Sequence, residues 1–377
     1  MNILLIGEYS RLHNSLKEGL LQLGHHAVIL GFNDGFKDYP VDLRFEKKWD
    51  TGLFKKIKIG IYRLTGFDVS SYLTYRQFIK NKSKFEGFDV VQLINENSFF
   101  CTPHFERKIL NHLFKNNKKV FLLSCGDDYS NAKYSFENPD FKSGVQPYLE
   151  GKIEAKDFQN VLKFLHDDYR KLHEYISDNV AGIIASDMDY HIPLAQHPKY
   201  IGLIPNPINT DTIRFESHPV SDKVVFFLGI NNESYYKKGS DYFEKALQII
   251  QNKYSEKVEV IITRSIPYQQ YIQHYAKAHV LLDMAYAHDQ GYNALEAMAK
   301  GKVVFTGAEK EFEAFYQLHE PVNINAKPDV AYLVEQLSHL IENPESIEAI
   351  GKRARVFIEK EHNYIQIAGN YIKKWHP

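Results

Sequence analysis

The sequence predicts an α/β protein made of two doubly wound domains that face a central cleft. Three observations support this prediction: short apolar runs alternate with helical patterns, the alternation starts again near residue 224, and a polar segment separates the two halves. At 377 residues the chain is also too long for one ordinary core and long enough for two domains.

Five short runs in the first half predict buried parallel strands, because each is aliphatic or β-branched and is bounded by polar turns. They cover residues 2–6, 27–31, 90–94, 120–124 and 182–185. Helical patterns lie between them at residues 12–23, 105–114 and 158–177. The stretch 129–157 is rich in Asn, Gly, Pro and charged residues, so we expect a long loop or a small insertion there.

The second half repeats this alternation. Its predicted strands cover residues 224–229, 258–263, 279–283 and 303–305, and its predicted helices cover 242–251, 268–278 and 292–300. We therefore predict an N-terminal Rossmann-like domain at residues 1–208 and a C-terminal Rossmann-like domain at 209–360. Pro205 and Pro207 stiffen the hinge. The tail beyond residue 343 is helical by periodicity, and we expect its last helix, about 361–377, to pack back onto the first domain.

Composition argues against several classes of protein. The 46 basic and 47 acidic residues give a net charge of -1, which disfavours bulk nucleic-acid binding. Two cysteines, Cys101 and Cys125, imply no disulfide framework. The N-terminus reaches Gly7 and Glu8 too early for a signal peptide, and no apolar run is long enough to span a bilayer. We therefore expect a cytoplasmic protein.

Ligands of open parallel sheets bind at the carboxyl ends of the strands, so the cleft between two such sheets is the expected site. The first strand is followed by GEYSRLH, residues 7–13, which lacks the G-x-G-x-x-G pattern of dinucleotide-binding loops. This absence weighs against a nicotinamide-dependent enzyme.

The most informative segment is DQGYNALEAMAKGKVVF, residues 289–305. It predicts a Gly-containing turn, a short helix and a buried strand. The free backbone amides of the helix start, around Gly291, Tyr292 and Asn293, suit a phosphate. Glu296 lies a little over one turn further along, where a carboxylate can accept hydrogen bonds from both hydroxyls of a ribose. An ordinary surface glutamate is the alternative interpretation.

This segment resembles the C-terminal hallmark of glycosyltransferase family 4, a large family of retaining enzymes with the GT-B fold. In that family the helix region opens with Glu-Gly-Phe-Gly, and a second Glu follows eight positions after the first. Glu296 matches the second Glu and Gly291 the second Gly, but His288 stands in place of the first Glu, with Asp289 beside it. The resemblance implies that Asp289 or His288 contacts the donor sugar, that the donor is handled differently, or that activity is weakened.

Residues 224–239, VVFFLGINNESYYKKG, are similar to the strand–Gly–loop–Lys–Gly segment of the same family. Gly229 ends the strand, and Lys238 matches the Lys that neutralises the diphosphate, with Lys237 as its neighbour. The family's Arg position holds Ile230, so we predict that Arg264, after the next strand, binds the phosphates through its guanidinium fork. A solvated helix start is the alternative for the two lysines.

Loops of the first domain are predicted to border the acceptor. SCGDD, residues 124–128, resembles a strand-end segment of the family in which Gly126 lets the backbone approach a ligand and Asp128 hydrogen-bonds a sugar hydroxyl. Further candidate contacts at other strand ends are Ser10, Arg11, His13 and Asn95. A simple polar turn is the alternative for Asn95. Cys125 is interpreted as a small buried thiol, because the sequence places no histidine partner beside it.

Asp187 and Asp189 form an Asp-x-Asp pair, a pattern that can bind a metal ion. They follow Ser186 at a predicted helix start, where acidic side chains cap free N–H groups. The mechanism implied by the resemblance uses no metal, so we predict a helix cap, no required metal and no tightly bound cofactor.

Residues 45–82 interleave basic and apolar side chains. A basic amphipathic helix in this stretch could lie on the inner face of an anionic membrane, and many enzymes of the family act on lipid-linked acceptors. An ordinary surface helix is the alternative.

Together these observations predict a glycosyltransferase. It would move a sugar from a nucleoside diphosphate sugar, with UDP favoured and GDP as the alternative, to a hydroxyl of a glycan or lipid-linked acceptor, as in the synthesis of cell-surface polysaccharides. The resemblance implies that the anomeric configuration is retained. Two alternatives stay open: a catalytically impaired GT-B protein that binds nucleotides or carbohydrates, and a GT-B sugar-nucleotide epimerase.

Overall fold

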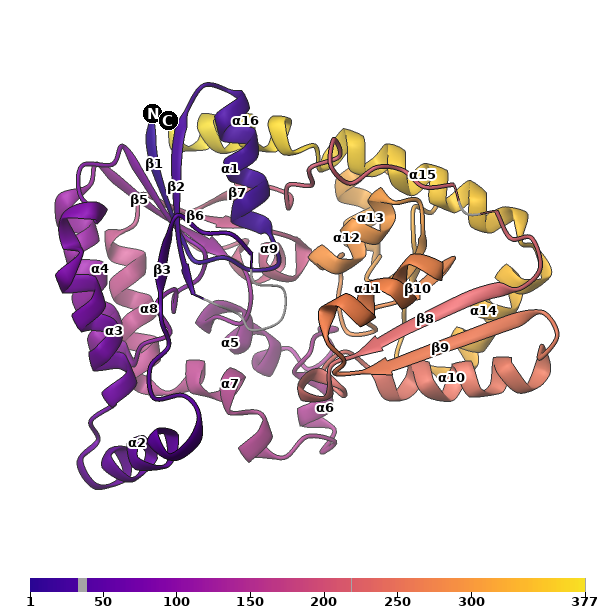
Figure 1. The fold of residues 1–377 in the computed structure, drawn as a ribbon, viewed down its shortest axis with the longest axis horizontal. Helices are drawn as coiled ribbons and strands as arrows, with labels where there is room; N and C mark the ends of the chain where they lie inside the picture. The colour runs from indigo at the N-terminus through magenta and orange to yellow at the C-terminus, as the bar shows by residue number, and fades with distance from the viewer. Residues whose placement is uncertain (33–38, 218, 377) are drawn as a thin grey trace.

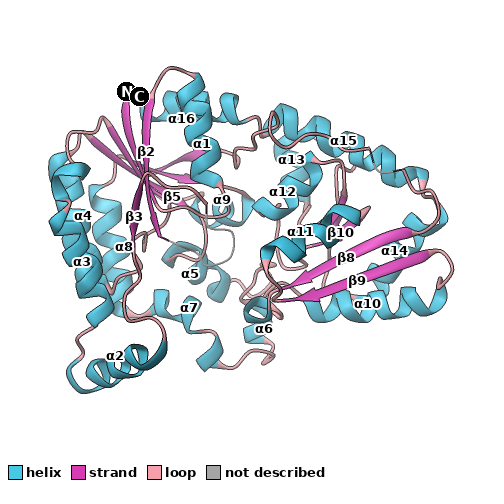
Figure 2. Cartoon of the chain, viewed as in Figure 1, coloured by secondary structure: helices cyan, strands magenta, loops and turns pink. Residues whose placement is uncertain are grey.

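The computed structural model describes residues 1–32, 39–217 and 219–376, which form two lobes, each built on a parallel sheet (Figure 1). The first sheet has seven strands in the order β3-β2-β1-β4-β5-β6-β7, and the second has five in the order β12-β11-β10-β8-β9. Figure 2 shows helices covering both sheets. The predicted fold class, two doubly wound α/β units, is therefore confirmed.

The central strands of the first lobe are buried on both faces, as parallel strands between two helical layers must be. Ile3 and Leu5 of β1 point into one core, and Leu4 and Ile6 point into the other. The strands are β1 (Asn2–Ile6), β2 (His26–Phe32), β3 (Leu43–Phe45), β4 (Val90–Leu93), β5 (Lys119–Ser124), β6 (Gly182–Ala185) and β7 (Tyr200–Leu203). The sequence did not predict β3 and β7, which are short strands at the two edges of the sheet.

Helices surround the sheet of the first lobe, and most of them pack on its two faces. The principal ones are α1 (Leu12–Gln22), α2 (Gly52–Thr65), α3 (Val69–Lys80), α4 (Pro103–Asn116), α8 (Asp167–Asn179) and α9 (Met188–Leu194), and a 3-10 turn, η1, covers Lys82–Phe85. The basic stretch 45–82 is therefore not one helix: α2 and α3 are separated by Gly66, which has the positive φ of 69° that a helix-ending glycine adopts.

The stretch 129–157 is helical, where the sequence predicted a long loop or small insertion. It contains α5 (Tyr129–Glu137), α6 (Gln146–Leu149) and the 3-10 turn η2 (Ala155–Asp157), and is followed by α7 (Gln159–Leu162) and η3 (Lys163–Leu165). These short elements share a small core made of Ala132, Val145, Phe158, Val161 and Phe164. That core also explains why the predicted helix 158–177 is broken, because the chain turns at His166 before α8 begins.

The second lobe repeats the architecture with a smaller sheet. Its strands are β8 (Val224–Ile230), β9 (Val258–Arg264), β10 (Val280–Leu282), β11 (Val303–Thr306) and β12 (Ile324–Asn325). Its helical elements are η4 (Asn232–Ser234), α10 (Ser240–Lys253), α11 (Tyr268–Lys277), α12 (Tyr292–Ala299), α13 (Lys310–Tyr316), α14 (Val330–Glu342) and α15 (Glu345–Glu361). The two-residue strand β12 has no signature that a sequence pattern would reveal.

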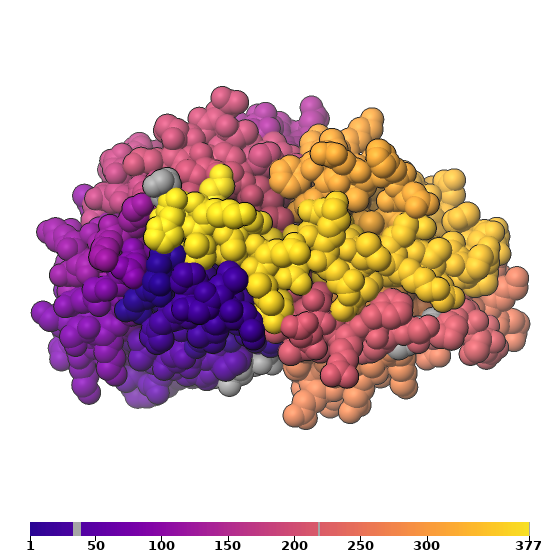
Figure 3. Space-filling view, turned by 90° about the horizontal axis from the view of Figure 1, so that it is seen from above, coloured from indigo at the N-terminus to yellow at the C-terminus, as the bar shows by residue number. Residues whose placement is uncertain are grey.

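The chain crosses between the lobes twice. The first crossing follows β7, and the second joins α15 to α16 (Tyr364–Trp375); the two crossings pair through a parallel bridge between Ile208 and Asn363. Helix α16 packs on α1 of the first lobe, as expected for the tail, although Pro377 lies outside the described residues. Figure 3 shows the C-terminal segment running across both lobes. The domain limits at residues 208 and 360 stay a prediction.

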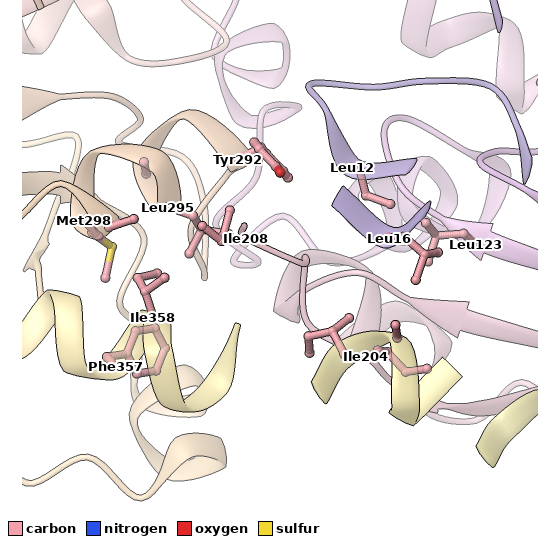
Figure 4. Close-up of a cluster of buried hydrophobic side chains, with 14 of the residues drawn as sticks. Leu12, Leu16, Leu123, Ile204, Ile208, Tyr292, Leu295, Met298, Phe357 and Ile358 are labelled. Carbon is pink, nitrogen blue, oxygen red and sulfur yellow. The ribbon is translucent and has the colours of Figure 1, made fainter. Parts of the chain in front are cut away.

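One hydrophobic cluster continues from lobe to lobe through these crossings (Figure 4). Leu12 and Leu16 contribute from α1, Ile208 from the first crossing, and Leu295 and Phe357 from the second lobe. The lobes therefore share apolar packing at the hinge side. Among the residues that the structure describes, no helix has the length and hydropathy of a membrane-spanning segment.

Candidate functional site

A cleft of about 850 Å³ lies between the lobes. On the first lobe it is lined by Asp127, just after β5, and by residues 152–161 of the helical insertion. On the second lobe it is lined by residues 231–237, after β8, and by Arg264 at the end of β9. The carboxyl ends of both sheets thus open onto one space, the place where open α/β sheets bind ligands.

The second lobe gathers positive groups at the start of α12. Gly291 occupies the N-cap position, and no side chain in the described part of the chain caps the helix, so its first amides are not used by a capping group there. The Nζ atom of Lys238 lies 3.0 Å from Oδ1 of Asp283, and Nδ2 of Asn293 donates to the same oxygen over 3.3 Å. Lys238, Asn293 and the helix start therefore meet around the buried carboxylate of Asp283.

Lys237 reaches across the cleft to the first lobe. Its Nζ atom lies 2.7 Å from each carboxylate oxygen of Asp127. Arg264 lines the cleft as well, with its side chain 48% exposed, and its guanidinium donates to the carboxylate of Glu244. Both cations therefore lie where the sequence predicted phosphate contacts, and each has a carboxylate partner in this state.

Glu296, the residue on which the nucleotide prediction depends, faces the gap between the lobes. Its side chain is half-buried. Burial and the nearby Glu296 carboxylate raise the pKa of Tyr39, which belongs to the first lobe. The same two causes raise the pKa of Tyr268 on α11, in the second lobe. The Glu296 carboxylate is therefore close enough to groups of both lobes to influence their ionisation.

Tyrosine rings that the sequence analysis did not single out surround this carboxylate. Tyr268, Tyr271 and Tyr275 follow one another along α11, with neighbouring ring centroids 6.4 and 6.0 Å apart. Gly229 makes room for them, because a Cβ atom at that position would lie 2.4 Å from the ring of Tyr271. Their spacing of three and four residues in a predicted helix was the available signal.

The two residues predicted to contact the donor sugar are both buried in the contact between lobes. Asp289 is 3% exposed, and its carboxylate accepts hydrogen bonds from the amides of Gln290, over 2.6 Å, and Met188, over 3.2 Å. The amide of His288 donates to Asp189 over 3.0 Å, and its ring stacks on Phe141 with centroids 4.4 Å apart. This loop fastens the second lobe to α9 and to the helical insertion of the first.

Tyr292 has a similar role. Its hydroxyl lies 2.6 Å from Oγ of Ser15 and donates to the carbonyl oxygen of Pro207 over 2.9 Å, and the residue is 7% exposed. The side chain that was predicted to bind nucleotide therefore joins α12 to α1 and to the hinge, which leaves only the backbone of Tyr292 for a ligand.

On the acceptor side, two predicted contacts hold loops together. Asp128 is 2% exposed; it caps α5 by accepting from the amide of Asn131 over 2.7 Å, and it also accepts from the hydroxyl of Ser124. Burial raises its pKa to about 7. Asn95 donates to the carbonyl oxygens of Cys125 and Asp127 over 2.9 and 3.1 Å. The expectation that Asp128 bonds a sugar hydroxyl is corrected, because its carboxylate is enclosed and occupied.

Gly126 and the loop after β1 remain close to the cleft. Gly126 has a φ of 81°, and a Cβ atom there would lie 3.5 Å from the ring of Tyr9. Ser10 is exposed, and Arg11 adopts a left-handed conformation with φ 78° before α1, where its guanidinium pairs with Glu18 at 2.7 Å. These residues stay candidate contacts.

His13 is not available to a ligand. It is fully buried, with Nδ1 2.6 Å from the carbonyl oxygen of Gly7, and burial lowers its pKa to about 4. Its neighbour Glu8, which the sequence analysis passed over, is held by the amide and side chain of Asn14 at 2.8 and 2.6 Å. Burial raises the pKa of Glu8 to about 7, and its Oε1 atom has no hydrogen-bond partner among the residues that the structure describes.

The capping interpretation of the Asp-x-Asp pair agrees with the geometry, since Asp187 accepts from the amide of Asp189 at the start of α9. No group of three or more His, Cys, Asp or Glu side chains within the described residues has a metal-binding arrangement. Burial raises the pKa of the Cys125 thiol to about 12, which makes this thiol a poor nucleophile.

Comparison with known proteins decides the fold type. Residues 237–373 match a family model described as glycosyl transferase-like, and no curated protein matches the chain significantly. Sucrose-phosphate synthase from Thermosynechococcus elongatus superposes with a TM-score of 0.62 at 13% identity, over 100% of this chain and 98% of that one. The chain has the GT-B fold.

Two further solved structures also superpose on the whole chain. Alr3699/HepE from Anabaena, in complex with UDP and glucose, has a TM-score of 0.59 at 10% identity and covers 99% of both chains. The catalytic domain of starch synthase IV from Arabidopsis thaliana, bound to ADP and acarbose, has a TM-score of 0.58 at 10% identity, over 100% of this chain and 98% of that one. With the family model, these GT-B structures support the prediction of a glycosyltransferase enzyme. Membership of family 4 and the retaining outcome stay predictions.

Proposed function

We propose that this protein is a glycosyltransferase that moves a sugar from a nucleoside diphosphate sugar to a hydroxyl group of a glycan or lipid-linked acceptor, with retention of configuration. UDP is the favoured nucleotide and GDP the alternative. One observation carries the proposal: the Glu296 carboxylate and the uncapped start of α12 lie on the same helix at the gap between the lobes. Complexes of GT-B neighbours with UDP and glucose, or with ADP and acarbose, are consistent with it.

Different residues bind different parts of the proposed donor. Glu296 accepts hydrogen bonds from the ribose hydroxyls, and the tyrosines of α11 offer flat apolar surface beside it. The amides at the start of α12 and the ammonium of Lys238 stabilise the negative charge that develops on the departing diphosphate. In this role Lys238 exchanges its contact with Asp283 for a phosphate oxygen. Positive charge from the helix end and the lysine makes a metal ion unnecessary in the proposed reaction.

A second candidate function is a nucleotide-binding protein without transfer activity. It is favoured by one observation, the enclosure of His288 and Asp289 between the lobes, because no side chain at these positions is left to hold the donor sugar. A third candidate, epimerisation of the sugar nucleotide, uses the same fold and the same nucleotide contacts.

The three candidates separate in one experiment. The protein is incubated with a panel of UDP- and GDP-sugars, and free nucleotide and sugar nucleotides are measured by chromatography. We expect slow release of UDP with one donor sugar, unaffected by a metal chelator. Tight binding without release would favour the binding protein, and a changed sugar nucleotide without release would favour the epimerase.

Glu296→Ala tests the nucleotide site directly. Loss of hydrogen bonds to a charged group costs about 1.5–3 kcal/mol, so we expect UDP affinity to fall by about 10- to 100-fold in calorimetry. The matched control is Glu259→Ala, an exposed position on β9. Unchanged UDP affinity in Glu296→Ala would remove this residue from the site and the proposal with it.

A further inference from the structure

Helix α2 is a 14-residue helix without a single buried side chain. It projects from the end of the first lobe, where it is attached to α3 and to the segment before it (Figure 1). Helices of globular proteins obtain most of their stability by burying an apolar face, so a helix that buries none has an unpartnered face.

The exposed face of α2 is apolar. Leu53, Ile57 and Leu64 have the spacing that places side chains on one side of a helix, and Leu53 and Leu64 are 70% and 88% exposed. Phe54 and, just beyond the helix, Phe67 are exposed as well. Large apolar side chains gathered in this way on a surface mark an interaction site.

The charge of α2 is entirely positive. The helix contains Lys55, Lys56, Lys58 and Arg63 and no acidic residue. Lys58 pairs with Asp50 at 2.5 Å, whereas Lys55, Lys56 and Arg63 form no ion pair with any residue that the structure describes. These three cations are therefore open to an anionic partner.

A cavity of about 200 Å³ lies between α2, α3 and the loop after β4, and both signs of charge line it. Its lysines are Lys47, Lys58 and Lys163, and its carboxylates are Asp50 and Asp68. Because Asp50 pairs with Lys58, the positive charge that is open to a partner lies on the outer surface of α2.

We propose that α2 lies on the surface of an anionic phospholipid membrane, with Leu53, Ile57 and Leu64 in the interface and Lys55, Lys56 and Arg63 on the headgroup phosphates. An apolar stripe bordered by lysine and arginine is the composition of helices that lie in the plane of a membrane interface. A second copy of the chain is a poorer partner, because two such helices would bring like charges together.

This surface is separate from the nucleotide site, so the inference does not depend on the proposed transfer reaction. The full-length protein is mixed with phosphatidylcholine vesicles or with mixed phosphatidylcholine–phosphatidylglycerol vesicles, and bound protein is measured by flotation. We expect binding to the anionic vesicles only, and we expect it to weaken with added salt.

Two variants locate the contact. Each basic residue near an anionic surface contributes about fivefold to binding, so Lys55→Ala/Lys56→Ala/Arg63→Ala is expected to lower the partition coefficient about 100-fold. Leu53→Ser/Leu64→Ser removes the apolar contact and is expected to lower it at least about tenfold. Neither variant touches a buried side chain, so both are expected to keep the wild-type thermal midpoint and UDP affinity.

Matched controls lie on the second lobe. Lys257→Ala removes an exposed lysine before β9, and Val356→Ser removes an apolar side chain of α15 that is 62% exposed. Both are expected to bind vesicles like the wild type. Equal binding to neutral vesicles, equal binding by all variants, or no binding would overturn the proposal. A concentration-dependent dimer that Leu53→Ser/Leu64→Ser abolishes, without vesicle binding, would assign the face to a second copy instead.

Discussion

At the scale of single residues, acidic side chains of this protein are used in opposite ways. Glu296 is half-buried and faces the gap between the lobes, whereas Asp289 and Asp128 are enclosed and hold backbone amides. The sequence placed Asp289 and Asp128 at a helix start and a strand end near the cleft, and Glu296 a little over one turn inside a helix. It could not show which carboxylates are open to the cleft, because that depends on which groups of the other lobe or of neighbouring loops donate hydrogen bonds to them.

The enclosure of Asp289 has a consequence for pH. Burial raises the pKa of its carboxyl from 3.8 to about 7, so between these values the folded protein holds a proton that the unfolded chain has released. The contribution of this group to stability is therefore complete below about pH 4 and is lost as the pH rises through about 7.

Asp289→Asn should remove this dependence. We expect the fall in stability of the wild type between pH 5 and pH 8 to exceed that of the variant by about 1–3 kcal/mol, measured from urea unfolding at both pH values. The lost hydrogen bond shifts the variant equally at both pH values, so the slope is the informative quantity. Glu8 and Asp128, whose pKa values burial also raises to about 7, are present in both proteins. Parallel pH profiles would contradict the expectation.

At the scale of elements, the sequence predicted long periodic helices and central strands well, and it failed at short edge elements. Strands β3, β7 and β12 lie at sheet edges and are only partly buried, whereas the equally short central strands β10 and β6 are buried throughout and therefore have a clearer apolar pattern. The segment that holds α5 and α6 was expected to be a loop or small insertion because its composition is polar. Its few apolar residues, among them Ala132 and Val145, pack with Phe158 and stabilise short helices that local propensity does not predict.

Close packing of α15 depends on one glycine. A Cβ atom at Gly351 would lie 2.1 Å from the carbonyl oxygen of Gly301, in the turn between α12 and β11. Gly351→Ala is therefore expected to destabilise the protein by about 1–3 kcal/mol, although alanine favours helix formation. Thermal or urea unfolding of the variant and the wild type measures this change in the free energy of unfolding.

Gly369 in α16 is the matched control, because a Cβ atom there would meet nothing within 4 Å. Gly369→Ala is expected to stabilise the protein by up to about 1 kcal/mol. If both alanine variants are stabilised, α15 can move away from the turn, and the glycine is not required for packing.

At the scale of the whole molecule, polar contacts join the lobes on the side of the helical insertion, away from the shared apolar cluster. Nζ of Lys142, from the segment between α5 and α6, lies 2.5 Å from Glu309 at the start of α13 and also donates to the carbonyl oxygen of Ala326. Lys237 and Asp127 form another such pair. Together with the Asp289 loop, these contacts describe a closed arrangement of the two lobes.

Removing the Lys142–Glu309 pair should open the lobes. Burial lowers the pKa of Lys142, and its side chain is only 13% exposed, so the pair is worth more than a surface ion pair. We expect Lys142→Ala and Glu309→Ala each to increase the radius of gyration in small-angle X-ray scattering. In the equilibrium between the open and closed lobes, we expect a coupling free energy between these two side chains of about 1–3 kcal/mol. The double variant should open no further than either single one.

The control for this experiment is Lys171→Ala, which breaks an ion pair with Asp167 inside α8 and should leave the radius unchanged. Additive opening by Lys142→Ala and Glu309→Ala would show that the two side chains act independently and would contradict the closure role of the pair.

The sequence by itself determined the two doubly wound sheets, the helix that carries Glu296 and the glycine at its start, because periodicity, turn residues and chain order are local properties. Tertiary structure alone decided which predicted side chains are open to a ligand. Lys238 and Glu296 stay partly exposed, whereas Tyr292, His288 and Asp289 join the lobes. The physical reason is that exposure and hydrogen-bond partners depend on segments 100 or more residues away, such as Met188 for Asp289, and local pattern holds no information about their approach.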